Sequence, residues 1–386
     1  MAQQWSVAVV GASGAVGAAL LAVLEEREFP VAELHALGRA DAEDDTLVFA
    51  NRSVRVKPLA GFDFKRCQLV FFCAPAEVAA EHVPRALAAG CRVIDLSRQF
   101  RGDPAVPLVV PELNAASLPR DAGLVAAPGA PAAQLVAALA PLQRAAGLLE
   151  VQVTTLLAVS DRGRAGIDEL AGQTARLLNA QSFKQRVFPA QIAFNLFPSF
   201  DAPQESGYTL GEQQTAAEVK KLLADEQLVI SVTELFAPVF YGHSQVVRLR
   251  TREALTPAQA RKLLRKAPGI ELVDGKDDCL SPVGDSAGSD AVLVGRIAQV
   301  PEQPDWLTLW VVADNVRKSA AVNTVQIAEI LLKPHTELRL TAFIENYSRF
   351  PRQTRSLGFS RGAAVLVGQL GFSRCPARGN GPVAVP

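Results

Sequence analysis

The chain has 386 residues, of which 49% are hydrophobic and 20% charged, and its 39 basic and 39 acidic side chains give a formal net charge of zero. This length predicts two domains, and the composition excludes a globally disordered chain, a collagen-like fibre and a small disulfide scaffold. The balanced charge argues against nucleic acid as the main partner. The five cysteines form no CxxC pair, no apolar run is long enough to span a membrane, and the first ten residues lack signal-peptide features. We therefore expect a cytoplasmic protein with reduced thiols and no membrane partner.

The first 130 residues alternate short apolar runs with helix-forming stretches. Trp5–Val10 predicts a buried parallel strand, followed by a glycine-rich turn at residues 11–17 and a helix at 18–26. Further strands are expected at 34–37, 69–73, 92–95 and 123–126, and a further helix at 76–89. This alternation predicts an α/β domain with a doubly wound, Rossmann-type parallel sheet over residues 1–130.

The sequence changes character over residues 131–315. Its β-rich segments at 151–160, 229–232, 246–250, 291–299 and 307–313 are separated by helical stretches at 168–179 and 210–223. We expect an α+β domain with a mixed or largely antiparallel sheet. Residues 318–333 read as one long helix, within a segment (316–335) that returns to the first domain.

The last 51 residues, 336–386, differ from the rest of the chain. They carry seven Arg, no Lys and two Glu among many Gly, Pro and Ser residues, which predicts a mostly disordered tail of unknown role. This tail contributes a net charge of +5, so residues 1–335 carry −5. The argument against a nucleic-acid partner therefore holds for the body of the chain.

The glycine-rich turn is a candidate phosphate site. Glycines at a strand-to-helix turn let the backbone approach a pyrophosphate, and the helix N-terminus adds N–H donors and a favourable dipole. The residues expected to bind the cofactor are Gly11, Ser13, Gly14, Ala15, Val16 and Gly17. The alternative is a tight structural turn without a ligand.

Arg39 bears on the choice of cofactor. It stands near the end of the second expected strand, where an acidic residue would bind the ribose of NAD, and an arginine there favours the 2′-phosphate of NADP. Nearby acidic residues at 41–45 weaken this preference, and an exposed loop charge is the alternative.

Several longer strings, taken in chain order, resemble the aspartate-β-semialdehyde dehydrogenase family. They lie at residues 11–17, 93–101, 107–114, 165–170, 193–195, 242–244, 294–297 and 310–318. The resemblance covers residues 5–333 and implies an NADP-binding Rossmann domain plus an α+β domain that forms a homodimer. It also implies reductive dephosphorylation of β-aspartyl phosphate, in which a cysteine thiolate attacks the acyl carbon and a histidine handles protons.

At the catalytic positions that the resemblance assigns, the sequence departs from the family. Ala130 stands in place of the nucleophilic cysteine, Leu157 in place of a glutamine, and Phe236 in place of the arginine that would bind the substrate carboxylate. The Glu and Lys that shape the substrate site fall around residues 211–214, where Gln214 is the nearest match and the lysine is missing.

Three matching residues remain. His243, in a Gly-His-Ser string, keeps the acid/base position, Arg101 matches a phosphate-contacting arginine, and Asn315 lies in the nicotinamide-side string. The structural alternatives are a histidine that bonds to backbone or fills the cleft, and an arginine held in a salt bridge. Pro75, after the third expected strand, removes an amide that could face a cofactor, so NADP binding is expected but not secured.

These departures favour a non-catalytic or divergent family member, a dimer able to bind a nicotinamide dinucleotide. Two other interpretations stay open. One is an active NADP-dependent oxidoreductase on a more apolar carbonyl substrate, without a thioester and with His243 as proton donor. The other is an interaction protein that pairs with a genuine dehydrogenase subunit. No metal site is expected.

Overall fold

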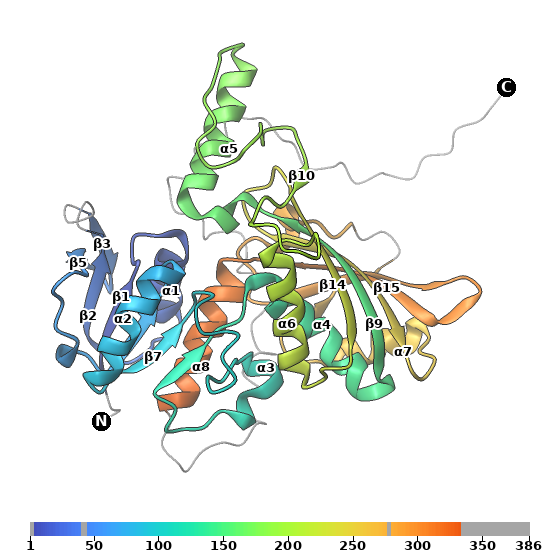
Figure 1. The fold of residues 1–386 in the computed structure, drawn as a ribbon, viewed down its shortest axis with the longest axis horizontal. Helices are drawn as coiled ribbons and strands as arrows, with labels where there is room; N and C mark the ends of the chain where they lie inside the picture. Colours follow the sequence, from blue (N-terminus) through green and yellow to red (C-terminus); the bar gives the residue numbers. More distant parts are fainter. Residues whose placement is uncertain (1–3, 40–44, 276–278, 333–386) are drawn as a thin grey trace, which may run out of the picture. The chain divides into compact units, whose positions relative to one another are not determined.

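A computed structural model describes residues 4–39, 45–275 and 279–332 of the chain (Figure 1). Residues 1–333 form one compact unit, which is described here by itself. The expectations for the tail at 336–386 lie outside the described residues. Within them, no helix has the length and apolar character that a membrane span requires.

Six parallel strands form the first sheet. They lie in the order β5-β2-β1-β6-β7-β8, with bounds β1 Trp5–Val10, β2 Val31–Gly38, β5 Lys57–Pro58, β6 Leu69–Phe72, β7 Arg92–Asp95 and β8 Leu124–Ala126. This is the Rossmann-type sheet expected from the sequence. The strand order reverses between β1 and β6, and ligands of such sheets bind outside the carboxyl ends of the strands at that point.

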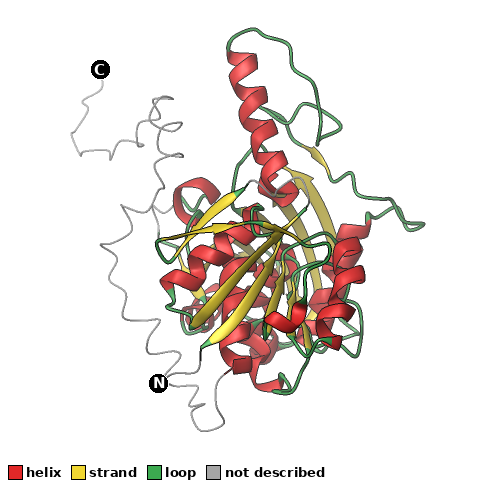
Figure 2. Cartoon of the chain, turned by 90° about the vertical axis from the view of Figure 1, so that its left-hand side faces the viewer, coloured by secondary structure: helices red, strands yellow, loops and turns green. Residues whose placement is uncertain are grey.

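Helices cover both faces of this sheet, which explains why its central strands are apolar without alternation (Figure 2). Helices α1 (Ala15–Glu26) and α8 (Asn323–Leu332) pack on one face, where Leu20 and Val325 share a core with Val9. Helix α2 (Ala76–Ala88) packs on the other, where Val83 shares a core with Val10. A hairpin of β3 (Thr46–Phe49) and β4 (Arg52–Arg55), η2 (Phe64–Arg66), α3 (Pro111–Asn114) and η3 (Ala115–Ser117) complete this half.

A seven-stranded mixed sheet forms the second half of the unit. Its order is β10-β11-β9-β12-β15-β14-β13, in which the β9–β11 and β13–β14 pairs are parallel and the others antiparallel. The bounds are β9 Leu148–Leu157, β10 Phe197–Pro198, β11 Val229–Phe236, β12 His243–Thr251, β13 Ile270–Leu272, β14 Val292–Val300 and β15 Gln303–Ala313.

Three helices share a single core with one face of the second sheet: α4 (Ala130–Ala146), α6 (Leu210–Leu223) and α7 (Pro257–Arg265). After β9 the chain forms the short η4 (Val159–Arg162) and then α5 (Gly163–Leu178), which projects beyond the strand ends (Figure 1). The expected second architecture, a mixed sheet with helices, is therefore present.

Three helical segments differ from the sequence-based expectation. Helix α4 was absent from it, because its Ala- and Leu-rich sequence is buried almost all round and carries Pro131 and Pro141, so no amphipathic period marks it. The helix expected at 318–333 begins with a π-helical stretch, η6 (Arg317–Val322), in which the amide of Ser319 bonds to the carbonyl of Asp314 five residues earlier. A second π-helical stretch, η5 (Pro282–Ser286), was also unexpected.

Candidate functional site

The glycines of the first turn meet backbone that leaves no room for a side chain. Gly11 has a φ of +80°, and a Cβ there would lie 2.3 Å from the carbonyl oxygen of Cys73 at the end of β6. A Cβ on Gly17 would lie 2.2 Å from the carbonyl oxygen of Gly11. The turn is therefore folded tightly between β1 and β6, at the point where the strand order reverses.

The start of α1 is open to an anion. Its N-cap, Gly14, provides no side-chain hydrogen bond, so no side chain caps the first helical amides, which include those of Ala15 and Val16. Ser13 is exposed beside them, and Arg39 is exposed directly after β2. These residues fit a pyrophosphate and a 2′-phosphate by position and charge. On the other side of the turn, Pro75 caps α2 and has no amide to offer.

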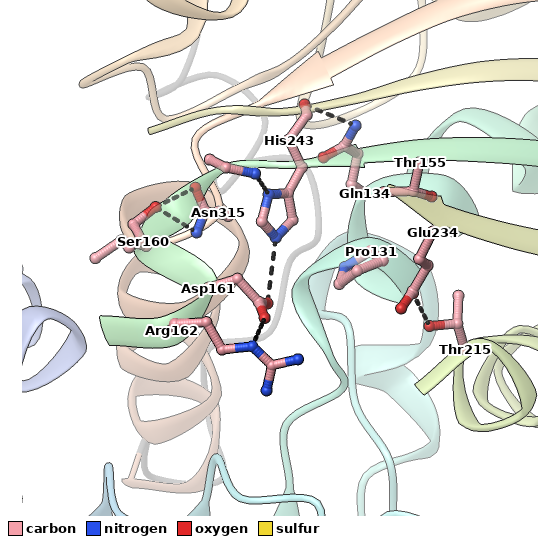
Figure 3. Close-up of polar contacts among 12 residues, drawn as sticks. Pro131, Gln134, Thr155, Ser160, Asp161, Arg162, Thr215, Glu234, His243 and Asn315 are labelled. Carbon is pink, nitrogen blue, oxygen red and sulfur yellow. Dashed lines mark hydrogen bonds and ion pairs between the residues drawn. The ribbon is translucent and has the colours of Figure 1, made fainter. Parts of the chain in front are cut away.

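Ala130 and His243 belong to one site, because the start of α4 is bonded to β12. The side chain of Gln245 donates to the carbonyl of Pro131 at 3.0 Å, and Gln134, one turn later, donates to the carbonyl of His243 at 3.2 Å. Ala130 is the first residue of α4. The position assigned to a nucleophile thus directly precedes Pro131, which lies on the helix turn next to His243 (Figure 3).

Arg101 also lies at the start of α4. Its guanidinium donates to the carbonyls of Ala127 (2.9 Å) and Leu96 (2.6 Å) and pairs with Glu218 at 3.4 Å. Glu218 in turn accepts a 2.6 Å hydrogen bond from the amide of Gly129, the N-cap of α4. A Cβ at Gly129 would lie 2.9 Å from an Arg101 nitrogen, so the glycine is what lets the arginine approach.

A glutamate and a lysine of α6 reach this site, but not at the expected positions. Glu218 and Lys221, one and two turns beyond Gln214, face Arg101 and its loop. The ammonium of Lys221 donates to the carbonyls of Arg101, Asp103 and Val106 at 3.0, 2.7 and 3.1 Å. All three of its donors are thereby used to hold the 101–106 loop. Burial is the main reason that the pKa of Lys221 is lowered.

The tautomer of His243 follows from its hydrogen bonds. The ring is fully buried at the first position of β12, and its Nδ1 accepts a 3.0 Å hydrogen bond from the amide of Ala158. Nδ1 therefore carries the lone pair, and the proton of the neutral ring is on Nε2. Nε2 points at the carboxylate of Asp161, 3.6 Å away, and makes no hydrogen bond (Figure 3).

Asp161 lies between His243 and Arg162. Its other carboxylate oxygen is 3.8 Å from Nε of Arg162, which also makes no hydrogen bond although that nitrogen is buried. Burial alone would raise the pKa of Asp161, but His243, Arg162 and Arg101 outweigh it and lower the pKa. Asp161 is thus an ionised carboxylate whose two oxygens face two buried N–H groups.

Arg162 lies over an aromatic ring that stands at an expected arginine position. Its guanidinium carbon is 5.1 Å from the centre of the Phe236 ring and 4.7 Å from that of Phe200, and its terminal nitrogen bonds to Asp201 at 2.6 Å. A positive charge therefore remains above Phe236, supplied by the turn before α5. Sequence analysis did not single out Arg162.

Leu157 and Phe236 are core residues in the structure. They pair in register at the ends of β9 and β11 and pack with Leu170, Phe188 and Ile192 in one buried cluster. The Phe236 ring centre lies 5.3 Å from those of Phe188 and Phe200. The apolar side chains at these positions thus fill space beneath α5, and do not line an open apolar surface.

Glu234 is a buried carboxyl whose charge is coupled to that of Asp161. It is 4% exposed and accepts a 3.1 Å hydrogen bond from Thr215, while its amide donates to Glu212. Burial, followed by the charges of Asp161, Glu212 and Asp201, raises its pKa to about 8. Glu234 is therefore mostly protonated at neutral pH, although nothing in the sequence pattern marked it.

The nicotinamide-side string makes internal contacts. Asn315 accepts a 3.0 Å hydrogen bond from the amide of Gly242 and exchanges hydrogen bonds with Ser160 (Figure 3). Arg317 bonds to Glu26 of α1 and to Asp290, and Lys318 forms a buried ion pair with Glu112 of α3. Asn315, like the two cations, thus links segments that are far apart in the chain.

Comparison with known proteins places this site in a family context. The family model described as "Semialdehyde dehydrogenase, NAD binding domain" matches residues 6–120, and that described as "Semialdehyde dehydrogenase, dimerisation domain" matches residues 139–318. The aspartate-semialdehyde dehydrogenase 2 of Vibrio cholerae is 42% identical over 337 residues, which is 87% of this chain and 100% of the relative. The "USG-1 protein homolog" of Pseudomonas aeruginosa is 42% identical over 335 residues, 86% of this chain and 99% of the relative.

Solved structures give the same picture. The crystal structure of aspartate semialdehyde dehydrogenase II from Vibrio cholerae aligns with a TM-score of 0.83 and 42% identity over 86% of this chain and 100% of that one. A probable aspartate-semialdehyde dehydrogenase from Pseudomonas aeruginosa aligns with a TM-score of 0.80, also at 42% identity, over 86% of this chain and 99% of that one. The resemblance noted in the sequence is therefore confirmed over nearly the whole described chain.

Proposed function

The chain belongs to the aspartate-semialdehyde dehydrogenase family, and from that premise we propose that it is a homodimeric, nicotinamide-dinucleotide-binding member without the family's thioester chemistry. The observation that carries this proposal is Ala130 at the first position of α4, on the helix turn next to His243. A methyl group cannot form or release a thioester.

Three of the four cysteines among the described residues are poor substitute nucleophiles. Cys67 and Cys91 lie at the amino ends of β6 and β7, the sheet edge away from the first turn. Cys73 is at the carboxyl end of β6, but burial and then the charge of Asp95 raise its pKa to about 12. It would be a neutral thiol at physiological pH. Cys279 is exposed and precedes η5.

The hydrogen bonds of His243 also argue against a role as general base. The lone pair of Nδ1 is bonded to the amide of Ala158, and the Nε2 proton is directed at Asp161. A base needs an accessible lone pair within hydrogen-bond reach of the substrate. These contacts fit the structural alternative for His243, in which its ring is bonded to neighbouring backbone.

The nucleotide half of the proposal rests on the first turn. Gly11, Gly14 and Gly17 give the tight turn, Ala15 and Val16 belong to the uncapped start of α1, and Arg39 would meet the 2′-phosphate of NADP. When bound, the cofactor would supply a hydride acceptor or donor. These residues would bind the phosphates of the cofactor. The chain would then act by binding a ligand, or in regulation, without catalytic turnover.

The homodimer half of the proposal rests on the face of the second sheet opposite α4, α6 and α7. On this face Val246 is 44% exposed and lies in register with Thr154 of β9 and Trp310 of β15. Further exposed apolar side chains lie on and after α5, at Leu178, Phe194 and Leu196. Exposed apolar sets of this kind mark protein interfaces. Val246→Asp should convert the dimer to a monomer in size-exclusion chromatography with light scattering.

An active oxidoreductase on an apolar carbonyl substrate is the alternative function. The buried packing of Leu157 and Phe236 counts against it, because these side chains form a filled core and offer no apolar surface to a substrate. Pairing with a genuine dehydrogenase subunit is a third possibility that the same sheet face could serve. Co-expression with that subunit would separate it from homodimerisation.

A titration of the purified chain with NADPH and NADH tests the proposal directly. We expect NADPH binding with a matching rise in melting temperature, together with no phosphate-dependent oxidation of aspartate semialdehyde. The control is Gly11→Ala, which should lose binding. Absence of any shift with either nucleotide would refute the nucleotide half, and turnover would refute the non-catalytic half.

A further inference from the structure

Two buried N–H groups that face Asp161 have no hydrogen-bond acceptor. One is Nε2 of His243, whose ring is fully buried, and the other is Nε of Arg162, which is buried although the rest of its side chain reaches the surface. A buried donor without a partner costs about 1–3 kcal/mol. Two such donors facing one point therefore suggest a place for an acceptor with two oxygens.

That place is held by Asp161 from the same turn of the chain. Its oxygens lie 3.6 Å from Nε2 of His243 and 3.8 Å from Nε of Arg162, one oxygen for each donor. Both distances are several tenths of an ångström beyond a normal N–H···O hydrogen bond. Asp161 therefore attracts both N–H groups electrostatically but forms a hydrogen bond with neither.

The loose fit has a physical reason in the chain path. Asp161 and Arg162 are consecutive residues of η4, so the backbone they share restricts how closely the carboxylate can approach Nε of Arg162. A free oxyanion has no such restraint. The Asp161 side chain is about 30% exposed, so it can turn toward solvent without unfolding the turn.

The surroundings define the charge of an acceptable ligand. Arg162 is held in place by Asp201 and by the rings of Phe200 and Phe236, and the charge of Arg101 reaches Asp161. Glu234, a further carboxyl whose charge is coupled to Asp161, has its pKa raised to about 8 and adds little negative charge at pH 7. With Asp161 turned away, Asp201 would still balance the charge of Arg162, so the two unsatisfied N–H groups would be what attracts an oxyanion.

We propose that His243 and Arg162 form an oxyanion site in which Asp161 acts as an internal competitor. The site would take a small phosphate- or carboxylate-class anion, and the resting chain binds it weakly because its own carboxylate occupies the position. This inference goes beyond the proposed function and does not depend on nucleotide binding, since none of its residues belongs to the first turn.

Calorimetric titration with inorganic phosphate and with acetate, at constant ionic strength and pH 7, tests the inference. The proteins are wild type, Asp161→Ala and, as a matched control, Asp168→Ala, which removes a largely exposed carboxylate of α5 paired with Arg164. We expect Asp161→Ala to bind at least one probe ten or more times more tightly than wild type, and Asp168→Ala to match wild type. The probe that tightens more identifies the anion class.

A second substitution separates the site from a general charge effect. Arg162→Gln in the Asp161→Ala background should return the affinity to the wild-type value or below. Asp161→Asn, which keeps the side-chain shape, serves if the alanine variant does not fold, and should also tighten binding. Equal affinity in wild type and both Asp161 variants would overturn the inference, as would tightening that survives Arg162→Gln.

Discussion

Replacing Glu234 by glutamine should remove a specific part of the pH dependence of stability. The folded chain raises the pKa of Glu234 from 4.5 to about 8, first by burial and then by the charges of Asp161, Glu212 and Asp201. The folded state therefore holds a proton that the unfolded state has already released over this range. The contribution of Glu234 to the unfolding free energy is therefore fully present below about pH 4.5 and is lost as the pH rises toward 8.

The slope of this effect is about 1.4 kcal/mol per pH unit for one proton, so between pH 5.5 and 7.5 the wild type should lose about 3 kcal/mol through Glu234 alone. Glu234→Gln keeps the shape and can still accept from Thr215, but it carries no proton to lose. Urea unfolding of both proteins at fixed protein concentration, at pH 5.5, 6.5 and 7.5, gives the difference in unfolding free energy.

The unfolding free energy of Glu234→Gln relative to the wild type should rise with pH, by about 3 kcal/mol from pH 5.5 to 7.5. Taking the difference cancels other groups that titrate in the same range, including His35 and His82, whose pKa values burial lowers. Glu205→Gln, at an exposed glutamate, is the matched control for the loss of a carboxylate as such. A difference between wild type and Glu234→Gln that stays constant with pH would refute the assignment of a protonated Glu234.

Three further substitutions test other parts of the account. Ala130→Cys should leave phosphate-dependent semialdehyde oxidation at background, because the expected glutamine and arginine are also replaced, by Leu157 and Phe236. A thioester intermediate in mass spectrometry would contradict this. Arg101→Ala should lower the unfolding free energy by about 3 kcal/mol, because it leaves the buried carboxylate of Glu218 without its cation. In urea unfolding the loss should be smaller when Glu218→Gln is added, and an unchanged loss would argue against the ion pair. Gly11→Ala should lower the unfolding free energy by about 1–3 kcal/mol through the positive φ of this position. The clash of the new Cβ with Cys73 should lower it further. A variant with wild-type melting temperature and NADPH affinity would show that the turn is not as tight as described.

The fold could be predicted largely from local patterns. The strand at Trp5–Val10, the turn at residues 11–17 and the alternation that follows predict a Rossmann-type sheet, because buried parallel strands and strand-to-helix turns leave direct signals. Helix α4 left no such signal, since a helix buried on nearly all sides has no polar face to reveal its period.

The site was predictable only where single residues fixed it. Ala130 and His243 were both identified from strings, and the structure joins them through contacts of Gln134 and Gln245 that no sequence pattern announces. The position of the Arg162 charge above Phe236 and the raised pKa of Glu234 were not predictable, because both depend on neighbours far away in the chain.

The direct test of the central claim is one assay on the purified full-length chain. NADP, inorganic phosphate and aspartate semialdehyde are supplied together, and NADPH formation is followed at the same protein concentration at which NADPH binding has been measured. The account predicts measurable NADPH binding and a rate that equals the enzyme-free blank, because Ala130 cannot form the acyl-enzyme. A rate above the blank that depends on phosphate and on protein concentration would contradict it.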